Sequence, residues 1–434
     1  MRKNLNPIGA ERLVYEIREI VNIGKQIESF GKKIHWENIG DPINKGEKIP
    51  QWMKDILKEE IDNDLSWGYS PTRGSKGAID FILKNNNKTN ALKLDEEDIL
   101  FFNGLGDAIA TIYSRMASNA RLLLPSPCYT AHSIGESDHA GEKPILYHLD
   151  PENNWQPDIE EIRQKLENIE SICGILLINP DNPTGTVFLR ETIQKIVGLA
   201  KEFGLFIISD EIYQNVVFGE TPYTPLIEVI EDVPAIGMKG LSKEIPWPGS
   251  RCAWLEFYNR TNDPEFEFFV QRLLDTKMSQ VCATTLPQLA LPKILGHSEY
   301  PALLESRKEI LREKVDFIYD ELSKIDEVIV SKPQGALYFT VVFKKESLNE
   351  WQFIEIDPPE AKALIEEQVK NQPFDKKFCY YLLGAKGICV VPLSSFSSDL
   401  MGFRMTLLET DMDIFRQVVK EISVGIRAFF SSTL

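Results

Sequence analysis

The chain has 434 residues, of which 43% are hydrophobic, and its formal net charge is −17. This length exceeds one compact core and predicts two domains. The acidic charge disfavours nucleic acids and anionic membranes as partners, because no local basic patch offsets it. No apolar run reaches the length that spans a bilayer, and the N-terminus lacks the apolar core of a signal peptide.

The cysteines and histidines argue against a metal site. The six cysteines and five histidines are scattered, without a C-x-x-C pair or a metal-ligand spacing. In a chain of this length such cysteines are typical of reduced thiols. We therefore predict a cytoplasmic protein without a bound metal.

An amphipathic pattern opens the chain. Its apolar positions are Leu13, Ile17, Ile20, Val21 and Ile27. The pattern predicts an arm or first helix within residues 1–35 that packs on the rest of the chain. The segment 34–42 then predicts a short strand ending in a turn, where Gly40 could bring the backbone close to a ligand. A helix over 50–61 and an aromatic loop containing Tyr69 follow. A plain turn and a packing tyrosine are the alternatives at these two positions.

Between about residue 70 and residue 250, short apolar strands alternate with helical patterns. The predicted strands are 95–102, 121–125, 144–149, 174–178, 205–213 and 233–238. The predicted helices are 75–84, one that opens at the turn 103–109, 158–166 and 189–203. This alternation predicts a mostly parallel sheet with helices on both faces. Ligands gather at the carboxyl ends of such strands. The candidate groups at these ends are Gly104, Tyr129, Asn182, Asp210 and Lys243.

The last third of the chain predicts a smaller α/β domain. The helical patterns are 265–278, 285–295 with a kink at Pro292, 300–321, 360–370 and 411–429. The strand patterns are 328–331, 335–342, 387–391 and 403–407. The helix over 300–321 is long and charged, so we expect it to bridge the domains. We predict an arm and part of the small domain in 1–50, a large domain in 51–310 and a small domain in 311–434.

The turn 103–109 resembles half of a dinucleotide-binding fingerprint. Ile109 stands at the third glycine position, and no ribose-binding acid follows at the proper interval, so we reject a Rossmann site. A glycine turn that opens a helix still presents free backbone N–H groups. The sequence therefore predicts an anion site at this turn.

Two lysines lie close together in the stretch 238–251. Nothing marks out Lys239, whereas Lys243 follows Ser242 just beyond a short apolar strand. A lysine near the end of a buried strand is costly unless it is paired or chemically engaged. Such a lysine is also a candidate for a Schiff base with a carbonyl compound. The ordinary alternative is a solvated surface lysine.

Three motifs occur in the order of a known family. Residues 179–185 resemble N-P-x-N-P-T-G, residues 209–213 resemble a D-E-x-Y strand end, and residues 242–251 resemble S-K-x(4)-P-G-x-R. Together they resemble the class I/II aminotransferases, pyridoxal-phosphate (PLP) enzymes of fold type I, from Gly40 to Arg404. The resemblance implies an α/β three-layer sandwich with a mostly parallel central sheet, a smaller α/β domain, and a homodimer with shared active sites.

The resemblance also implies roles around the cofactor ring. Lys243 would form the Schiff base with the cofactor and carry the proton between the substrate Cα and the cofactor C4′. Asp210 would keep the ring nitrogen protonated. Tyr213 and Asn182 would hydrogen-bond the phenolic oxygen, and Tyr129 would stack on the ring.

Two anions need partners in such a site. By resemblance the phosphate would bind the helix start, two polar side chains and a tyrosine of the neighbouring subunit. These residues are Gly104, Leu105, Gly106, Ser242, Arg251 and Tyr69. The substrate α-carboxylate would bind Arg404, with help from the Gly40 N–H and Asn182.

Three residues depart from the family pattern near the phosphate. Gly240 stands where many relatives carry a serine, and Asp107 and Glu244 are acidic. The Asp107 carboxylate must therefore point away from the phosphate. These departures concern phosphate binding and leave the predicted cofactor unchanged.

The resemblance implies transfer of an amino group between an L-amino acid and a 2-oxo acid by a ping-pong mechanism. No second arginine is clearly placed for a dicarboxylate, Arg272 being a weak candidate, so we expect a neutral substrate side chain.

A PLP lyase, such as a C–S β-lyase or an aminocyclopropane-carboxylate-synthase-like enzyme, shares the same motifs. A non-catalytic PLP-sensing regulator is the remaining alternative, although such proteins carry an N-terminal DNA-binding domain, which the segment before residue 70 does not resemble.

Overall fold

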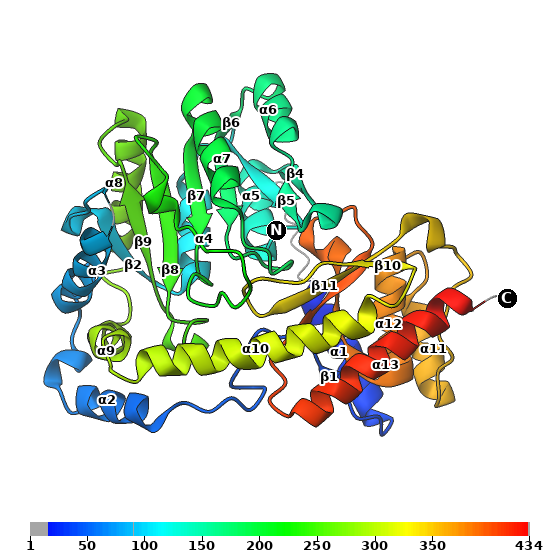
Figure 1. The fold of residues 1–434 in the computed structure, drawn as a ribbon. Helices are drawn as coiled ribbons and strands as arrows, with labels where there is room; N and C mark the ends of the chain where they lie inside the picture. Colours follow the sequence, from blue (N-terminus) through cyan, green and yellow to red (C-terminus); the bar gives the residue numbers. More distant parts are fainter. Residues whose placement is uncertain (1–15, 90, 433–434) are drawn as a thin grey trace, which may run out of the picture.

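The computed structural model describes residues 16–89 and 91–432, and an eight-stranded sheet forms its centre (Figure 1). The strand order is β2-β9-β8-β7-β6-β3-β4-β5. The strands are β2 Ile99–Asn103, β3 Arg121–Ser126, β4 Ile145–Asp150, β5 Gln156–Pro157, β6 Ile172–Ile178, β7 Phe206–Asp210, β8 Ala235–Gly240 and β9 Cys252–Tyr258. The neighbours from β8 to β4 pair in parallel, whereas β9 is antiparallel to both β2 and β8, and β5 is antiparallel to β4.

Both faces of this sheet are buried under helices. Alternate strand residues point to opposite faces, so Leu122 and Leu124 belong to one apolar cluster and Leu123 to the other. The first cluster includes α4 Leu105–Arg115 and α8 Pro264–Ser279, with α5 Thr130–Ala140 beside them. The second cluster includes α2 Gln51–Ile61, α3 Lys76–Thr89, α6 Ile159–Asn168, α7 Arg190–Phe203 and α9 Thr285–Leu295. The predicted three-layer arrangement with a mostly parallel sheet is confirmed.

A second apolar core belongs to a smaller domain. Its sheet has the order β10-β11-β14-β13 and is antiparallel throughout, and a separate parallel pair joins β1 to β12. The strands are β1 His35–Trp36, β10 Val328–Val330, β11 Tyr338–Phe343, β12 Ile388–Cys389, β13 Val391–Pro392 and β14 Gly402–Thr406. The helices are α1 Glu16–Ser29, α10 Tyr300–Leu322, α11 Pro359–Gln368, α12 Phe374–Lys386 and α13 Met412–Ser431.

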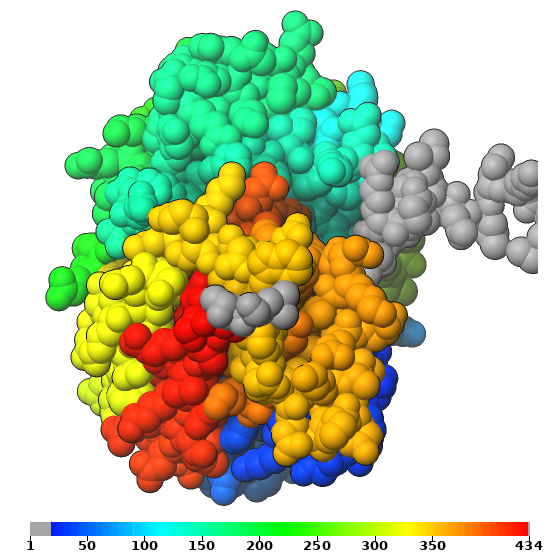
Figure 2. Space-filling model, turned by 90° about the vertical axis from the view of Figure 1, so that its right-hand side faces the viewer, coloured from blue at the N-terminus to red at the C-terminus, as the bar shows by residue number. Residues whose placement is uncertain are grey.

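The long helix α10 runs from beside α9 to the small domain (Figure 1). Its first turn packs on the large core through Tyr300 and Leu303, and its last turns pack on the small core through Leu311 and Ile318. The predicted boundary at residue 310 therefore falls inside one continuous helix. Figure 2 shows the small domain, in yellow to red, packed directly against the large domain.

The N-terminal prediction holds for the described part of the arm. Ile20 and Ile27 are buried in the small-domain core, and Val21 is half-buried. Leu13 and the side chain of Ile17 lie outside the described residues. None of the helices in residues 16–89 and 91–432 combines the length and apolarity that crossing a bilayer requires.

Some local predictions were wrong. The strand predicted over 205–213 ends at Asp210, because the Asp210 carboxylate accepts the Ile212 N–H at 3.1 Å and turns the chain. The sequence analysis missed β9, α5 and α12 altogether. It also merged β12 and β13, which pair with different strands. These elements are set by their packing partners, which are distant in the sequence.

Candidate active site

The structure separates the two neighbouring lysines. Lys239 lies on β8 with a 6% exposed side chain, and its Nζ is 3.2 Å from Glu256 Oε2 and 3.5 Å from Glu211 Oε2. Lys243 is half-buried, and its Nζ donates a hydrogen bond to the Gly40 carbonyl at 2.8 Å. In the described part of the chain, none of the ion pairs includes Lys243. Lys239 is therefore held by carboxylates, whereas the Lys243 amine meets a neutral acceptor.

The pKa of Lys239 supports this distinction. Burial by itself lowers the pKa of this lysine, but Glu256 and Glu211 outweigh burial and leave the pKa raised. An amine that stays protonated is a poor nucleophile. Of these two lysines, Lys243 is the one suited to covalent chemistry.

Parallel strands bring several predicted groups to one edge of the sheet. Asp210 is the last residue of β7, Asn182 follows β6, and Lys243 follows β8. The Asn179 N–H donates to the Asp210 carbonyl at 3.0 Å, which joins the ends of β6 and β7. The carboxyl ends of adjacent parallel strands are where open α/β sheets bind ligands.

Asp210 is buried and oriented by a histidine that the sequence analysis missed. His132 lies on α5, and its Nε2 is 3.4 Å from Asp210 Oδ2. The other ring nitrogen, Nδ1, is 3.4 Å from the Tyr113 hydroxyl. The Tyr129 ring packs edge-on to the same imidazole at 6.3 Å. With the proton on Nε2, His132 donates to the carboxylate and fixes its direction. A histidine three residues after Tyr129 was the available signal.

Tyr213 is paired with a second tyrosine, Tyr338 of β11, which the sequence analysis also missed. Their hydroxyl oxygens are 2.8 Å apart. Burial raises the pKa of Tyr213 well above its usual value, so its phenol stays neutral and can donate a hydrogen bond. A side chain at Gly40 would place its Cβ 2.6 Å from the Tyr338 hydroxyl, so only glycine fits beside this pair.

Arg404 lies on β14, buried between the domains. Its Nη1 donates to Asn182 Oδ1 at 3.3 Å, and its Nη2 donates to the Asn38 carbonyl at 2.5 Å. The guanidinium carbon lies 4.4 Å from the centroid of the Tyr338 ring. Stacking and hydrogen bonds together fix the plane of the Arg404 guanidinium. A guanidinium held in one plane can bind both oxygens of a carboxylate.

The glycine turn before α4 meets Arg251. Gly104 has φ +82°, and a Cβ there would lie 2.5 Å from Arg251 Nη2. Arg251 Nη2 also donates to the Asn103 carbonyl at 3.3 Å. The start of α4, with Leu105 and Gly106 as its first residues, therefore lies next to a guanidinium, an arrangement that suits an anion.

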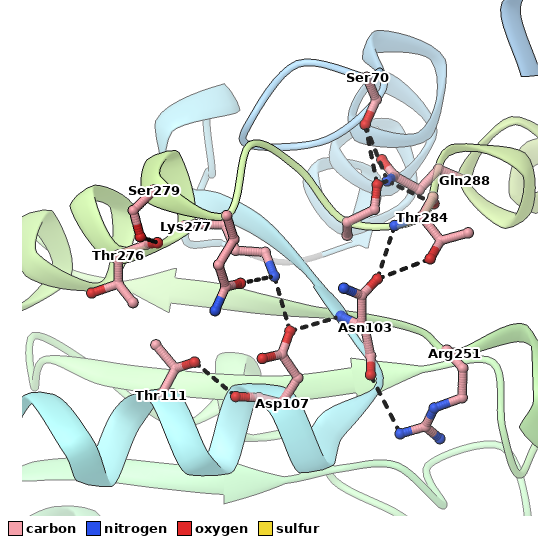
Figure 3. A network of polar contacts seen from close by, with 12 residues as sticks. Ser70, Asn103, Asp107, Thr111, Arg251, Thr276, Lys277, Ser279, Thr284 and Gln288 are labelled. Atoms are coloured by element: carbon pink, nitrogen blue, oxygen red, sulfur yellow. Dashed lines mark hydrogen bonds and ion pairs between the residues drawn. The ribbon is translucent and has the colours of Figure 1, made fainter. Parts of the chain in front are cut away.

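Asp107 is neutralised by contacts with α8 and with the start of the turn (Figure 3). Its Oδ2 accepts hydrogen bonds from Lys277 Nζ at 2.9 Å and from the Asn103 N–H at 3.1 Å. Lys277 lies on α8, 170 residues further along the chain, so its role was not predictable from local sequence. The acidic residue is thus compatible with an anion site.

The other two departures have structural reasons as well. A serine in place of Gly240 would put its Cβ 2.9 Å from the Cys252 carbonyl, because β8 and β9 are in close contact. Glu244 is buried, and its Oε2 accepts a hydrogen bond from Asn215 at 2.5 Å. Burial raises the pKa of Glu244 above its usual value.

Arg307 of α10 holds the backbone around Lys243. Its Nη1 donates to the Lys243 carbonyl at 2.9 Å and to the Glu244 carbonyl at 2.7 Å. Its Nε donates to Glu47 Oε1 at 2.6 Å. The bridging helix and the segment after Gly40 therefore meet at the loop that carries the lysine.

Two predicted residues are not enclosed in the site. Tyr69 is 85% exposed, on a loop that is tied to residues 283–285 by Ser70 and by the hydrogen bond from Thr285 Oγ1 to the Gly68 carbonyl. Arg272 lines a cavity of about 910 Å³ at the amino ends of the parallel strands, together with Phe206 and Pro234. The suggestion that Arg272 binds a substrate carboxylate was wrong, because it lies at the opposite edge of the sheet.

Asp181, within the N-P-x-N-P-T-G motif, gives a testable pH effect. Burial raises its pKa to about 7, and its Oδ2 accepts hydrogen bonds from Thr184 N and Oγ1 at 3.0 and 2.6 Å. An unfolded aspartate titrates near pH 4, so the folded chain binds the extra proton between about pH 4 and 7. The free energy of unfolding should therefore fall as pH rises through this window.

Replacing Asp181 with asparagine should remove this loss. The stability of D181N relative to the parent should rise by up to about 4 kcal/mol between pH 4 and pH 8, measured by denaturant unfolding at both values. D158N is the control, because Asp158 is exposed and also accepts backbone N–H groups. An equal difference in stability at both pH values would contradict the prediction.

The fold and the polar groups at this edge of the sheet suit the class of enzymes that bind a phosphorylated cofactor. The chain belongs to the aminotransferase class I and II family, whose model matches residues 35–421. It is 47% identical over 432 residues, covering 100% of each chain, to an uncharacterized aminotransferase of Methanocaldococcus jannaschii. It is 27% identical over 402 residues to the glutamate-pyruvate aminotransferase of Escherichia coli, covering 91% of this chain and 97% of that one.

A solved structure agrees with this assignment. The alanine aminotransferase from Pyrococcus furiosus superimposes with a TM-score of 0.83 at 25% identity, covering 98% of this chain and 100% of the other. Class I and II aminotransferases use pyridoxal phosphate. The residues present fit this group, because an available lysine amine, a buried carboxylate and an anion cradle lie at one edge of the sheet.

Proposed function

We propose that the chain transfers an amino group between an L-amino acid with a neutral side chain and a 2-oxo acid in a ping-pong cycle. The observation that carries this proposal is Lys243, which follows β8 at the sheet edge where β7 ends in Asp210, and whose amine donates a hydrogen bond to the Gly40 carbonyl. By their printed names, one of the two relatives pairs glutamate with pyruvate and the other uses alanine, so each name includes a substrate with a small neutral side chain.

The chain's own residues would hold the cofactor at three places. Bound pyridoxal phosphate supplies an electron sink for charge that develops at the substrate Cα. Asp210, oriented by His132, would hold a proton on the ring nitrogen. The neutral phenol of Tyr213 and the amide of Asn182 would donate to the phenolic oxygen, and Tyr129 would cover one face of the ring.

Phosphate binding and proton transfer use the remaining residues. Gly104, Leu105, Gly106, Ser242 and Arg251 would bind the phosphate. Lys243 would remove the proton from the substrate Cα and return it to the cofactor C4′. Arg307 would keep the Lys243 backbone in place during this transfer, since it holds two adjacent carbonyls.

Arg404 would bind the substrate α-carboxylate, with Asn182 and the Gly40 N–H beside it. Replacing Arg404 with lysine keeps the charge but removes the paired N–H donors of the guanidinium, so kcat/KM should fall about 100-fold or more. R416K is the control, because Arg416 pairs with Glu313 on the surface of α13. Steady-state kinetics test this, and an R404K enzyme with unchanged kcat/KM would show that the carboxylate binds elsewhere.

Single-turnover reactions test the substrate proposal. The enzyme carrying the amino form of the cofactor is mixed with a panel of 2-oxo acids, and return of the aldehyde form is followed by absorbance. We expect pyruvate and apolar 2-oxo acids to react faster than oxaloacetate. If none accepts the amino group, amino transfer is refuted, and release of a thiol from a sulfur amino acid would favour the lyase alternative.

We also propose a homodimer in which Tyr69 reaches the phosphate of the partner subunit. Tyr69 is 85% exposed and Trp67 is 77% exposed, on a loop that a second copy would bury. Sedimentation should give a dimer, and Y69F should weaken cofactor binding. A monomer with full activity would refute both statements.

A further inference from the structure

The turn proposed to bind the cofactor phosphate carries an acidic residue. Asp107 is the third residue of α4, in the first turn after Gly104. An unpaired carboxylate there would repel a phosphate held by the first N–H groups of the helix. A phosphate site on this turn therefore requires another group to neutralise Asp107.

Lys277 has the position and charge for this task (Figure 3). Its Nζ donates to Asp107 Oδ2 and to Gln280 Oε1, each at 2.9 Å, and lies 4.7 Å from the centroid of the Phe102 ring. The Lys277 side chain is 0% exposed. A buried cation is costly unless it is paired, so the pair with Asp107 accounts for this lysine.

The same pair joins the turn to a neighbouring segment. Asp107 Oδ2 also accepts the Asn103 N–H, and Asn103 Oδ1 accepts hydrogen bonds from Thr284 N and Oγ1 at 2.9 and 3.0 Å. Asn103 in turn offers its carbonyl to Arg251. Figure 3 shows these contacts as one network that links α4, the 280–284 segment and Arg251.

We propose that Lys277 is a positioning residue for the cofactor phosphate. It cancels the charge of Asp107 and holds that carboxylate against α8. This inference rests on the proposed function, because it assumes that the phosphate binds at the start of α4. Lys277 touches neither the substrate nor the cofactor and acts through Asp107.

A charge-removal cycle tests the proposal on the full-length chain. Cofactor-free protein is titrated with pyridoxal phosphate, with pyridoxal, which lacks the phosphate, and with inorganic phosphate. The variants are K277M, D107N, the double variant K277M/D107N and the control K293M, which removes a partly exposed lysine that pairs with the exposed Glu59 and the buried Glu60.

The expected results have opposite signs for the two single variants. K277M should bind pyridoxal phosphate and inorganic phosphate about 10- to 100-fold more weakly, with pyridoxal affinity unchanged. D107N should bind phosphate at least as tightly as the parent. The double variant should return to within about threefold of the parent, because neither charge remains.

Three results would overturn the role of Lys277. They are parent-like phosphate affinity in K277M, equal weakening for pyridoxal, and a double variant as weak as K277M. If K277M fails to fold, D107N decides alone, since a tenfold loss of phosphate affinity there would refute the proposal. R251M separates the two levels: unchanged phosphate affinity in R251M would refute the phosphate location itself, whereas weakened binding leaves only Lys277 in question.

Discussion

Replacement of Lys243 with alanine is expected to reduce amino transfer by at least about 1,000-fold, because general acid–base transfer alone contributes about 10²- to 10⁴-fold. The visible absorbance that attachment to the lysine gives the cofactor should also disappear. The fold should persist, since the Lys243 amine is hydrogen-bonded to one backbone carbonyl. Turnover, absorbance and thermal unfolding measure these three effects.

Two companion variants sharpen this experiment. K243R keeps a positive charge but offers no amine that can attach to the cofactor, so it should be as inactive as K243A. K201A removes an exposed lysine that pairs with Asp232, and it should retain parent activity. Retention of more than a tenth of the parent turnover in K243A would reject Lys243 as the proton carrier.

Replacement of Lys239 with methionine is expected to act on stability instead. Glu211 and Glu256 would be left together in a buried site, and Glu256 also accepts hydrogen bonds from Trp254 Nε1 and the Tyr258 hydroxyl. Removing one partner of a buried ion pair costs about 3–5 kcal/mol. For a domain of this size that corresponds to a fall of about 10 °C in the thermal midpoint.

A second substitution tests the cause of this loss. Burial raises the pKa of Glu211, so this carboxyl is the easier one to keep neutral. K239M/E211Q should therefore recover part of the lost midpoint, as only one carboxylate then remains. A K239M midpoint within 1 °C of the parent, about the error of the measurement, would show that the pair is not needed for stability.

The pair of lysines shows what the sequence could and could not predict. Lys239 lies near the end of an apolar strand and Lys243 just beyond it, and motif spacing favoured Lys243 over Lys239. The buried carboxylates that hold Lys239 come from β9 and from the residue after β7. Because β9 runs antiparallel next to β8, with Glu256 paired to Gly237, the Glu256 carboxylate reaches Lys239 only in the folded sheet.

The site residues missed by the sequence analysis share this cause. His132, Arg307, Tyr338 and Lys277 act on residues 64 to 170 positions away: His132 on Asp210, Arg307 on Lys243, Tyr338 on Tyr213 and Lys277 on Asp107. Local pattern carries no information on such pairings. Asp107 illustrates the consequence, because its acidity seemed unfavourable until its buried partner was placed.

The sequence by itself determined the α/β class, the family and the existence of the two strands near which Asp210 and Lys243 stand. These follow from short-range signals: apolar runs, turn residues and motif spacing. Only the tertiary structure decided that β9 is antiparallel, that the small sheet is antiparallel throughout, and which lysine is held by carboxylates. The physical reason is that strand direction and charge pairing depend on contacts between distant segments, which form together when the core closes.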